Sequence, residues 1–132
     1  MMENVSILLV EDDPITTFLT KKVIIACKAG TELVCKANGQ EALDYIAGQN
    51  TGALLLPDII LLDLNMPVLD GWGFLDTFKK NVNIYGKNIA LYICTSSTAP
   101  HDIMKAREYH FVKDFISKPL NTQKFLDLLK SL

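Results

Sequence analysis

The sequence predicts an α/β fold in which five strands alternate with five helices, a doubly wound (βα)5 arrangement around a parallel five-stranded sheet. Three observations along the 132 residues support it. Short apolar runs rich in branched side chains recur, segments with helical apolar spacing lie between them, and the connections are short. Such alternation implies right-handed crossovers, which place helices on both faces of the sheet.

The first apolar run, residues 5–10, ends abruptly at acidic residues, as expected for a strand that is buried on both faces. Pro14 suits the first turn of a helix. Apolar residues then recur at helical spacing over residues 15–29, and Gly30 is a natural stop. A short second strand is expected at residues 32–37.

The Asn38-Gly39 pair would signal a hairpin if a second alternating strand followed it. Residues 40–47 instead carry apolar side chains at helical spacing, so we interpret the pair as a strand-to-helix turn. Residues 58–62 form the second strongly apolar run, which ends at Asp63. This pattern again predicts a central parallel strand.

The second half of the chain repeats the alternation. A helix is expected over residues 72–80, where a tryptophan, a leucine and a phenylalanine are spaced three apart. A strand is expected at residues 89–94 and a helix at 100–110. Residues 111–117 contain the fifth strand, and residues 121–132 form a last helix that opens with a capping asparagine.

The composition fits a folded chain and excludes some functions. With 49% hydrophobic and 21% charged residues, the chain is unlike disordered proteins. The formal net charge of −2 argues against nucleic-acid binding, which needs a concentrated basic surface.

The three cysteines lie in apolar stretches without metal-ligand spacing, so buried, reduced thiols are expected. We expect no membrane association, because apolar runs stay well short of the roughly 18 residues of a membrane span. The first residues also lack the features of a signal peptide. A cytoplasmic location is therefore expected.

Polar side chains follow the predicted strands at their carboxyl ends. Glu11 and Asp12 follow the first strand, and Asp63 follows the third. Ligands of open parallel sheets bind at this edge, so these side chains are expected to share a pocket. Clustered carboxylates suit Mg²⁺ or Mn²⁺. Asp63, alone at the end of a central strand, is the leading candidate for a phosphoryl acceptor.

Two further groups are expected in the same pocket. Lys118 follows the fifth strand, where its ammonium could pair with a carboxylate before phosphorylation and with a phosphate oxygen afterwards. The hydroxyl of Thr95, after the fourth strand, could donate a hydrogen bond to the same phosphate. A new charge on Asp63 would then draw both residues inward and shift their loops.

Each signal also has a structural interpretation when it stands alone. An acidic pair after a strand is commonly a solvated turn, and Asp13 before Pro14 is expected to be a helix cap. A hydroxyl-rich loop or a lysine before proline is an ordinary surface feature. His101 and His110 are expected at the surface, because neither has a second ligand at metal spacing. The location of the polar groups at one sheet edge favours the functional interpretation.

The chain resembles the receiver domain of two-component response regulators nearly from end to end, and four segments carry the resemblance. They are ILLVEDD at 7–13, IILLDLNMPVLDGWGFL at 59–75, LYICTSS at 91–97 and FISKPL at 115–120. The resemblance implies the flavodoxin-like receiver fold with strand order 2-1-3-4-5. It also implies a stand-alone type, with one receiver domain over residues 1–132 and no output domain.

The resemblance assigns a role to each site residue. Asp63 looks like the phosphoacceptor, and Glu11 and Asp12 look like the pair that holds Mg²⁺ together with Asp63. The backbone carbonyl of Asn65 would complete the protein ligands.

The remaining roles concern the response to phosphorylation. Thr95 looks like the switch hydroxyl and is favoured over Ser96 and Ser97 because it directly follows the apolar strand. Lys118 looks like the phosphate-binding lysine, and its bond to proline is usually cis in this family. Phe115 falls where the family keeps a switch aromatic.

The function implied is that of a phosphorelay response regulator. A phosphohistidine of a histidine kinase or phosphotransfer protein would give its phosphoryl group to Asp63 in a Mg²⁺-dependent reaction. The surface around the fourth helix, fifth strand and fifth helix would then change and bind an unknown protein target. We expect a monomer or a phosphorylation-dependent dimer. We expect no enzymatic turnover beyond the protein's own phosphorylation and dephosphorylation.

Two other interpretations stay open from the sequence. A haloacid dehalogenase-type phosphatase also uses an aspartate nucleophile and Mg²⁺, but such enzymes keep a second aspartate where this chain has Asn65, and there is no room for a cap domain. The main alternative is a degenerate receiver that acts as a phosphorylation-independent protein-interaction module. The intact set of acids, hydroxyl and lysine argues against it.

Overall fold

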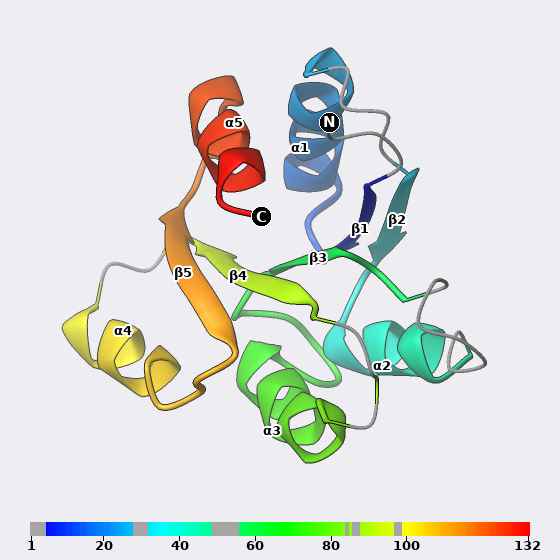
Figure 1. Ribbon diagram of the computed structural model, residues 1–132, viewed down its shortest axis with the longest axis vertical. Coiled ribbons are helices and arrows are strands. Elements are labelled where there is room, and N and C mark those ends of the chain that lie inside the picture. Colours follow the sequence, from blue (N-terminus) through cyan, green and yellow to red (C-terminus); the bar gives the residue numbers. More distant parts are fainter. Residues whose placement is uncertain (1–4, 28–31, 49–55, 84, 86–87, 97–98) are drawn as a thin grey trace.

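The sheet contains five parallel strands in the order β2-β1-β3-β4-β5 (Figure 1). The computed structural model describes residues 5–27, 32–48, 56–83, 85, 88–96 and 99–132. The strands are β1 (Ser6–Val10), β2 (Glu32–Lys36), β3 (Ile59–Leu62), β4 (Ala90–Thr95) and β5 (Val112–Ser117). The helices are α1 (Pro14–Ala26), α2 (Gly39–Gly48), α3 (Gly71–Asn81), α4 (Pro100–Ala106) and α5 (Thr122–Lys130). The predicted fold class and strand order are confirmed.

Helices cover both faces of the sheet, with α1 and α5 on one face and α2, α3 and α4 on the other (Figure 1). Alternate residues of each central strand point to opposite faces of the sheet and pack in the two hydrophobic cores there. Leu9 and Leu61 pack in the core that includes α1 and α5. Leu8 and Ile60 pack in the core that includes α2 and α3. Every residue of β3 is buried, which explains why this strand reads as a continuous apolar run.

The start of α1 is as predicted, and α2 begins at Gly39, one residue before the predicted segment. Asp13 caps α1, because its carboxylate accepts a hydrogen bond of 2.9 Å from the amide of Thr16. Asn38 caps α2 in the same way, accepting from the amide of Glu41 at 2.9 Å. The Asn38-Gly39 pair is therefore a strand-to-helix turn. The helical part of α1 ends at Ala26, and residues 28–30, where its end was predicted, lie outside the described residues.

The predicted extent of α4 is wrong, because the helix ends at Ala106 instead of continuing to His110. The amide of Tyr109 donates to the carbonyl of Ala106 at 3.1 Å in a tight turn. This turn lets the ring of Tyr109 stack on Trp72, with ring centroids 6.3 Å apart, while its hydroxyl donates to Asp76 at 2.6 Å. Contacts with α3 thus end α4 early.

Within the described part of the chain, no helix is long and apolar enough to cross a bilayer. The two histidines are exposed, as predicted. The expectation of buried thiols holds for Cys94, whereas Cys27 and Cys35 are only half-buried. All three cysteines are free.

Candidate functional site

Strand register explains why acidic residues from β1 and β3 meet. Val10 pairs with Leu62 as the two strands end side by side. The amide of Asp63 donates to the carbonyl of Val10 at 3.0 Å, so the chain leaves both strands at one level. On the other side of β1, the amide of Glu11 donates to the carbonyl of Lys36 at 3.0 Å. The ladder therefore fixes the backbones of Glu11 and Asp63.

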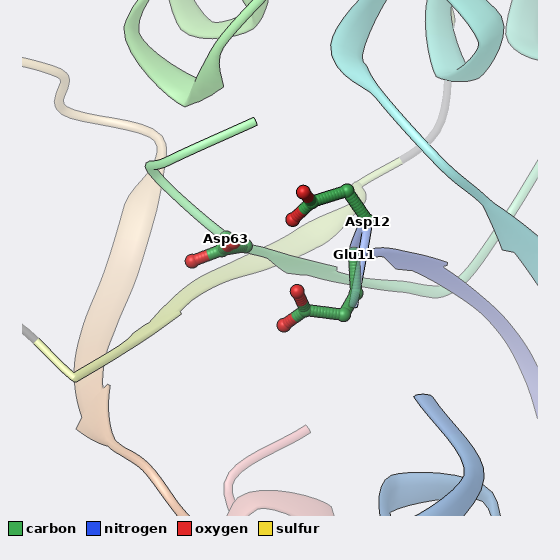
Figure 2. Close-up of side chains that lie close together, drawn as sticks. All are labelled: Glu11, Asp12 and Asp63. Carbon is green, nitrogen blue, oxygen red and sulfur yellow. The ribbon is translucent and has the colours of Figure 1, made fainter. Parts of the chain in front are cut away.

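The carboxylates of Glu11, Asp12 and Asp63 form one cluster at this edge (Figure 2). One oxygen from each residue lies within 4.8 Å of the others. Glu11 and Asp63 are each only 6% exposed, whereas Asp12 is exposed. Buried carboxylates this close repel one another unless a cation offsets their charge, and an oxygen-only donor set suits a hard divalent ion. The residues present therefore fit Mg²⁺.

Lys118 supplies positive charge to the cluster. Its ammonium forms an ion pair with Glu11 and lies 3.2 Å from Oδ1 of Asp63. Its backbone amide donates to the carbonyl of Thr95 at 2.9 Å, which ties the end of β5 to the end of β4. The peptide bond from Lys118 to Pro119 is cis. The ammonium of Lys118 pairs with two of the three carboxylates in the cluster, so negative charge remains in excess among these four groups.

The pKa values of the ion pair reflect this confinement. Burial raises the pKa of Glu11, although the hydrogen bond from Lys118 acts in the opposite direction. Burial acts against the charged form of Lys118, but the hydrogen bond to Glu11 and the charge of Asp63 outweigh it and raise the pKa of the ammonium. Burial thus makes Glu11 harder to ionise, while its carboxylate and that of Asp63 hold the proton on Lys118.

The two candidate switch residues lie on neighbouring strands. Thr95 is the last residue of β4, not the first loop residue as predicted, and its side chain is fully buried. Ser96 is exposed, and Ser97 lies outside the described residues. Phe115 lies opposite Ile93 in β5 and is half-buried against the core on the α3 side. Thr95 is thus enclosed at the end of β4, whereas the neighbouring Ser96 is open to solvent.

The loop after Asp63 contains a strained turn that sequence reasoning missed. Val68 has a φ of 67°, and the amide of Leu69 donates to the carbonyl of Pro67 at 2.8 Å across it. The i to i+2 hydrogen bond makes this a γ-turn of the rare form with positive φ. Asn65, whose carbonyl was the predicted fourth ligand, is exposed in the same loop. The loop that borders the cluster is thus held in a defined shape.

Two glycines let this loop pack against its neighbours. The amide of Gly39 donates to the carbonyl of Leu69 at 2.8 Å, and a Cβ at Gly39 would lie 2.6 Å from that oxygen. A Cβ at Gly71 would lie 2.5 Å from the carbonyl oxygen of Asp63. Both distances are too short for a side chain, so glycine is required at each position. The glycines were the only visible sequence signal for this packing.

Comparison with known proteins gives the family. The family model of the response regulator receiver domain matches residues 7–130. A probable methanogenesis regulatory protein, FilR2 of Methanothrix harundinacea, is 30% identical over 126 residues, covering 96% of this chain and 77% of its own. A crystal structure of a two-component response regulator from Cytophaga hutchinsonii superposes with a TM-score of 0.88 at 28% identity, covering 98% of this chain and 96% of that one.

A third relative was solved in its phosphorylated form. The cyanobacterial phytochrome response regulator RcpA superposes with a TM-score of 0.77 at 28% identity, covering 97% of this chain and 90% of its own. The strand order, the acidic cluster at the sheet edge and the family match agree with one another. The chain therefore belongs to the response regulator receiver domain family and is a receiver of two-component phosphorelay signalling.

Proposed function

We propose that Asp63 accepts a phosphoryl group from the phosphohistidine of a histidine kinase or phosphotransfer protein, in a reaction that requires Mg²⁺. The observation that carries the proposal is the cluster of Glu11, Asp12 and Asp63, in which Glu11 and Asp63 pair with the ammonium of Lys118. The ion would be held by these three carboxylates and the backbone carbonyl of Asn65. Mn²⁺ would fit the same oxygen ligands.

The proposed reaction is a displacement at phosphorus. A carboxylate oxygen of Asp63 forms the new O–P bond while the N–P bond to the donor imidazole breaks, and the bonding electrons stay on the imidazole nitrogen. The bound divalent ion supplies positive charge to the phosphoryl oxygens. Lys118, already 3.2 Å from Asp63, exchanges this carboxylate for a phosphoryl oxygen. The strand ladder fixes the backbone of Asp63, and this positions its carboxylate for the attack on phosphorus.

The readout would begin at the buried hydroxyl of Thr95. A phosphoryl group on Asp63 offers new acceptor oxygens, to which Thr95 and Lys118 would donate. These two residues are linked through the hydrogen bond between their backbones. Their inward movement would draw the ends of β4 and β5 together, and Phe115 would repack against the core beside them. The altered surface would bind a protein target.

The donor protein would dock beside the acidic cluster, on the first half of α1. Ile15, Phe18 and Leu19 are 70%, 58% and 53% exposed there. An adjoining groove of about 340 Å³ runs from the acidic cluster along α1, and Lys21 and Lys36 contribute to its wall. Exposed apolar side chains beside a reactive pocket suit a protein partner.

We place the phosphoryl transfer in the cytoplasm, since all three cysteines are free thiols.

We infer that the protein is a signalling switch without turnover of a separate substrate. The cluster can transfer a phosphoryl group to its own aspartate, and loss of that group to water would reset it. The state of association would be a monomer or a phosphorylation-dependent dimer.

Incubation with acetyl phosphate and Mg²⁺, followed by intact mass measurement, tests the proposal. The native chain is expected to gain one phosphoryl group, and to gain none when EDTA removes the metal ion before the reaction. Asp63→Asn is expected to gain none, while Asp44→Asn, a matched change at an exposed carboxylate on α2, behaves as the native chain does. An equal adduct on Asp63→Asn would overturn the assignment of Asp63. No adduct on the native chain would support the degenerate receiver instead.

A further inference from the structure

Lys124 breaks a local rule of helix chemistry. It lies in the first turn of α5, where Asn121 caps the helix by accepting from the amide of Lys124 at 2.8 Å. The positive end of the helix dipole favours acidic residues in a first turn and disfavours an ammonium. A lysine placed there is therefore expected to have another partner.

The partners of the Lys124 ammonium lie on the residues to either side of Lys118. Nζ of Lys124 donates to the carbonyl of Ser117 at 2.9 Å and to the carbonyl of Pro119 at 3.3 Å. It also lies 3.4 Å from the hydroxyl of Ser117. Three acceptors match the three donors of an ammonium. The side chain of Lys124 thus spans the short segment that carries Lys118.

The same segment is held from the opposite side by the strand ladder. The amide of Lys118 donates to the carbonyl of Thr95 at 2.9 Å, and its ammonium reaches Glu11 and Asp63. Residues 117–119 are therefore fixed by β4 on one side and by α5 on the other. Without the Lys124 contacts, the hydrogen bond to Thr95 in β4 would be the one of these contacts that still holds the backbone at Lys118.

Lys124 also shares the electrostatic environment of the pocket. Burial raises the pKa of the Cys94 thiol to about 11, and the charges that act on this thiol are those of Lys118, Glu11, Asp63 and Lys124. Lys124 is half-buried, so its charge is only partly screened by solvent.

We propose that Lys124 is a positioning residue for Lys118: by binding the carbonyls of Ser117 and Pro119, it holds the Lys118 ammonium at the distance from Asp63 that phosphoryl transfer requires. The inference rests on the proposed function of Asp63 and Lys118 and adds a residue to it. Within the part of the chain that the structure describes, the Lys124 ammonium contacts Ser117 and Pro119 and neither Glu11 nor Asp63. Its effect should therefore pass entirely through Lys118.

The test measures the rate of phosphorylation by acetyl phosphate at saturating Mg²⁺. Lys124→Met is expected to lower this rate roughly threefold to tenfold, because a loosened Lys118 samples unproductive positions. Its Mg²⁺ affinity should stay at the native value, because the metal-binding carboxylates are unchanged. Lys124→Arg, which keeps charge and donors, should restore most of the rate. Lys130→Met, at an exposed lysine in the last turn of the same helix, is the matched control and should have the native rate.

A double-mutant cycle separates positioning from general destabilisation. In a Lys118→Met background, Lys124→Met is expected to cause no further loss of rate. An equal loss in both backgrounds, a parallel loss of Mg²⁺ affinity, or a native rate for Lys124→Met would overturn the inference. Urea unfolding verifies that each variant is folded, and Lys124→Gln gives a second variant if Lys124→Met is not. A native rate for Lys118→Met would instead contradict the proposed role of Lys118, so the two failures are distinguishable.

Discussion

Helices α1 and α5 cover the same face of the sheet, yet they use similar apolar patterns in different ways (Figure 1). α5 buries Phe125, Leu128 and Leu129 in the core. α1 buries Ile24 but leaves Phe18 and Leu19 exposed. Helical apolar spacing therefore predicts that a segment is a helix, but it does not tell which apolar residues reach the core.

The difference follows from where each helix begins. α1 starts directly after the acidic residues at the end of β1, so its first turns lie beside the pocket, and Phe18 lines the groove there. The buried residues of α1 are Thr20 in its middle and Ile24 near its end. α5 packs its apolar side chains on the sheet down to its last turn. We interpret α5 as a core helix and the first half of α1 as an interaction surface.

The largest expected effect on stability is at Phe125. Phe125→Ala should lower the free energy of unfolding by about 3–5 kcal/mol, because the ring is fully buried and its removal leaves a cavity. Phe18→Ala, the same change on the exposed side of α1, should stay within about 0.5 kcal/mol. Urea unfolding measures both. Equal losses for the two variants would remove the distinction between the helices.

A second comparison lies within α1, between adjacent isoleucines. Ile24 is fully buried and Ile25 is 68% exposed. Ile24→Ala should cost about 2–5 kcal/mol in unfolding free energy, whereas Ile25→Ala should cost about 0.5 kcal/mol or less. Thermal or urea denaturation gives the values. A large loss at Ile25 would mean that the outer side of α1 packs on something in the folded chain.

The caps of the two helices should differ in their response to pH. Asn121→Ala should cost about 1 kcal/mol at any pH, because an amide cap does not titrate. Hydrogen bonds from Thr16 lower the pKa of Asp13. The capping stabilisation by Asp13 is therefore fully present above its unfolded pKa and is lost as the pH falls through the folded value.

Urea unfolding as a function of pH, on native chain and Asp13→Asn, checks this difference. The asparagine keeps an N-cap acceptor but removes the titrating group, so the acid-side slope of stability should become shallower. An unchanged slope would show that Asp13 does not contribute to the pH dependence.

Phe18→Ala has the smallest expected effect on stability, but it should impair recognition of the partner protein. Phe18→Ala should lower the rate of transfer from a phosphohistidine protein roughly tenfold, as is typical of an interface anchor. Its phosphorylation by acetyl phosphate should be unchanged, because the small donor needs no docking surface. Ile25→Ala, at the far end of the same helix, is the control for both donors. If both donors slow equally, Phe18 acts on the pocket and not on docking.

The fold and the acidic site could be predicted because their signals are local. A strand buried on both faces admits few polar residues, so β1 and β3 stand out as apolar runs. Parallel strands bring their carboxyl ends to one edge, and this places Glu11 near Asp63 without any knowledge of distances. The site thus followed from topology and residue type.

The features that escaped prediction depend on distant contacts or on broken local rules. Helix α4 ends early where the hydroxyl of Tyr109 donates a hydrogen bond to Asp76, 33 residues away in the sequence. Val68 adopts a positive φ that its side chain disfavours, so its residue type gave no indication of a γ-turn. Lys124 looks like an ordinary surface lysine in the sequence, because nothing in the pattern shows that its ammonium binds the carbonyls of Ser117 and Pro119.

Mapping the phosphorylated residue tests the central claim most directly. After reaction with acetyl phosphate and Mg²⁺, borohydride reduces an aspartyl phosphate to homoserine, and peptide sequencing by mass spectrometry locates it. We expect homoserine at position 63, in the peptide that follows β3, and none at Asp12 or Asp13. Homoserine at either of those positions, or an adduct that resists reduction, would contradict the assignment of Asp63 as the phosphoacceptor.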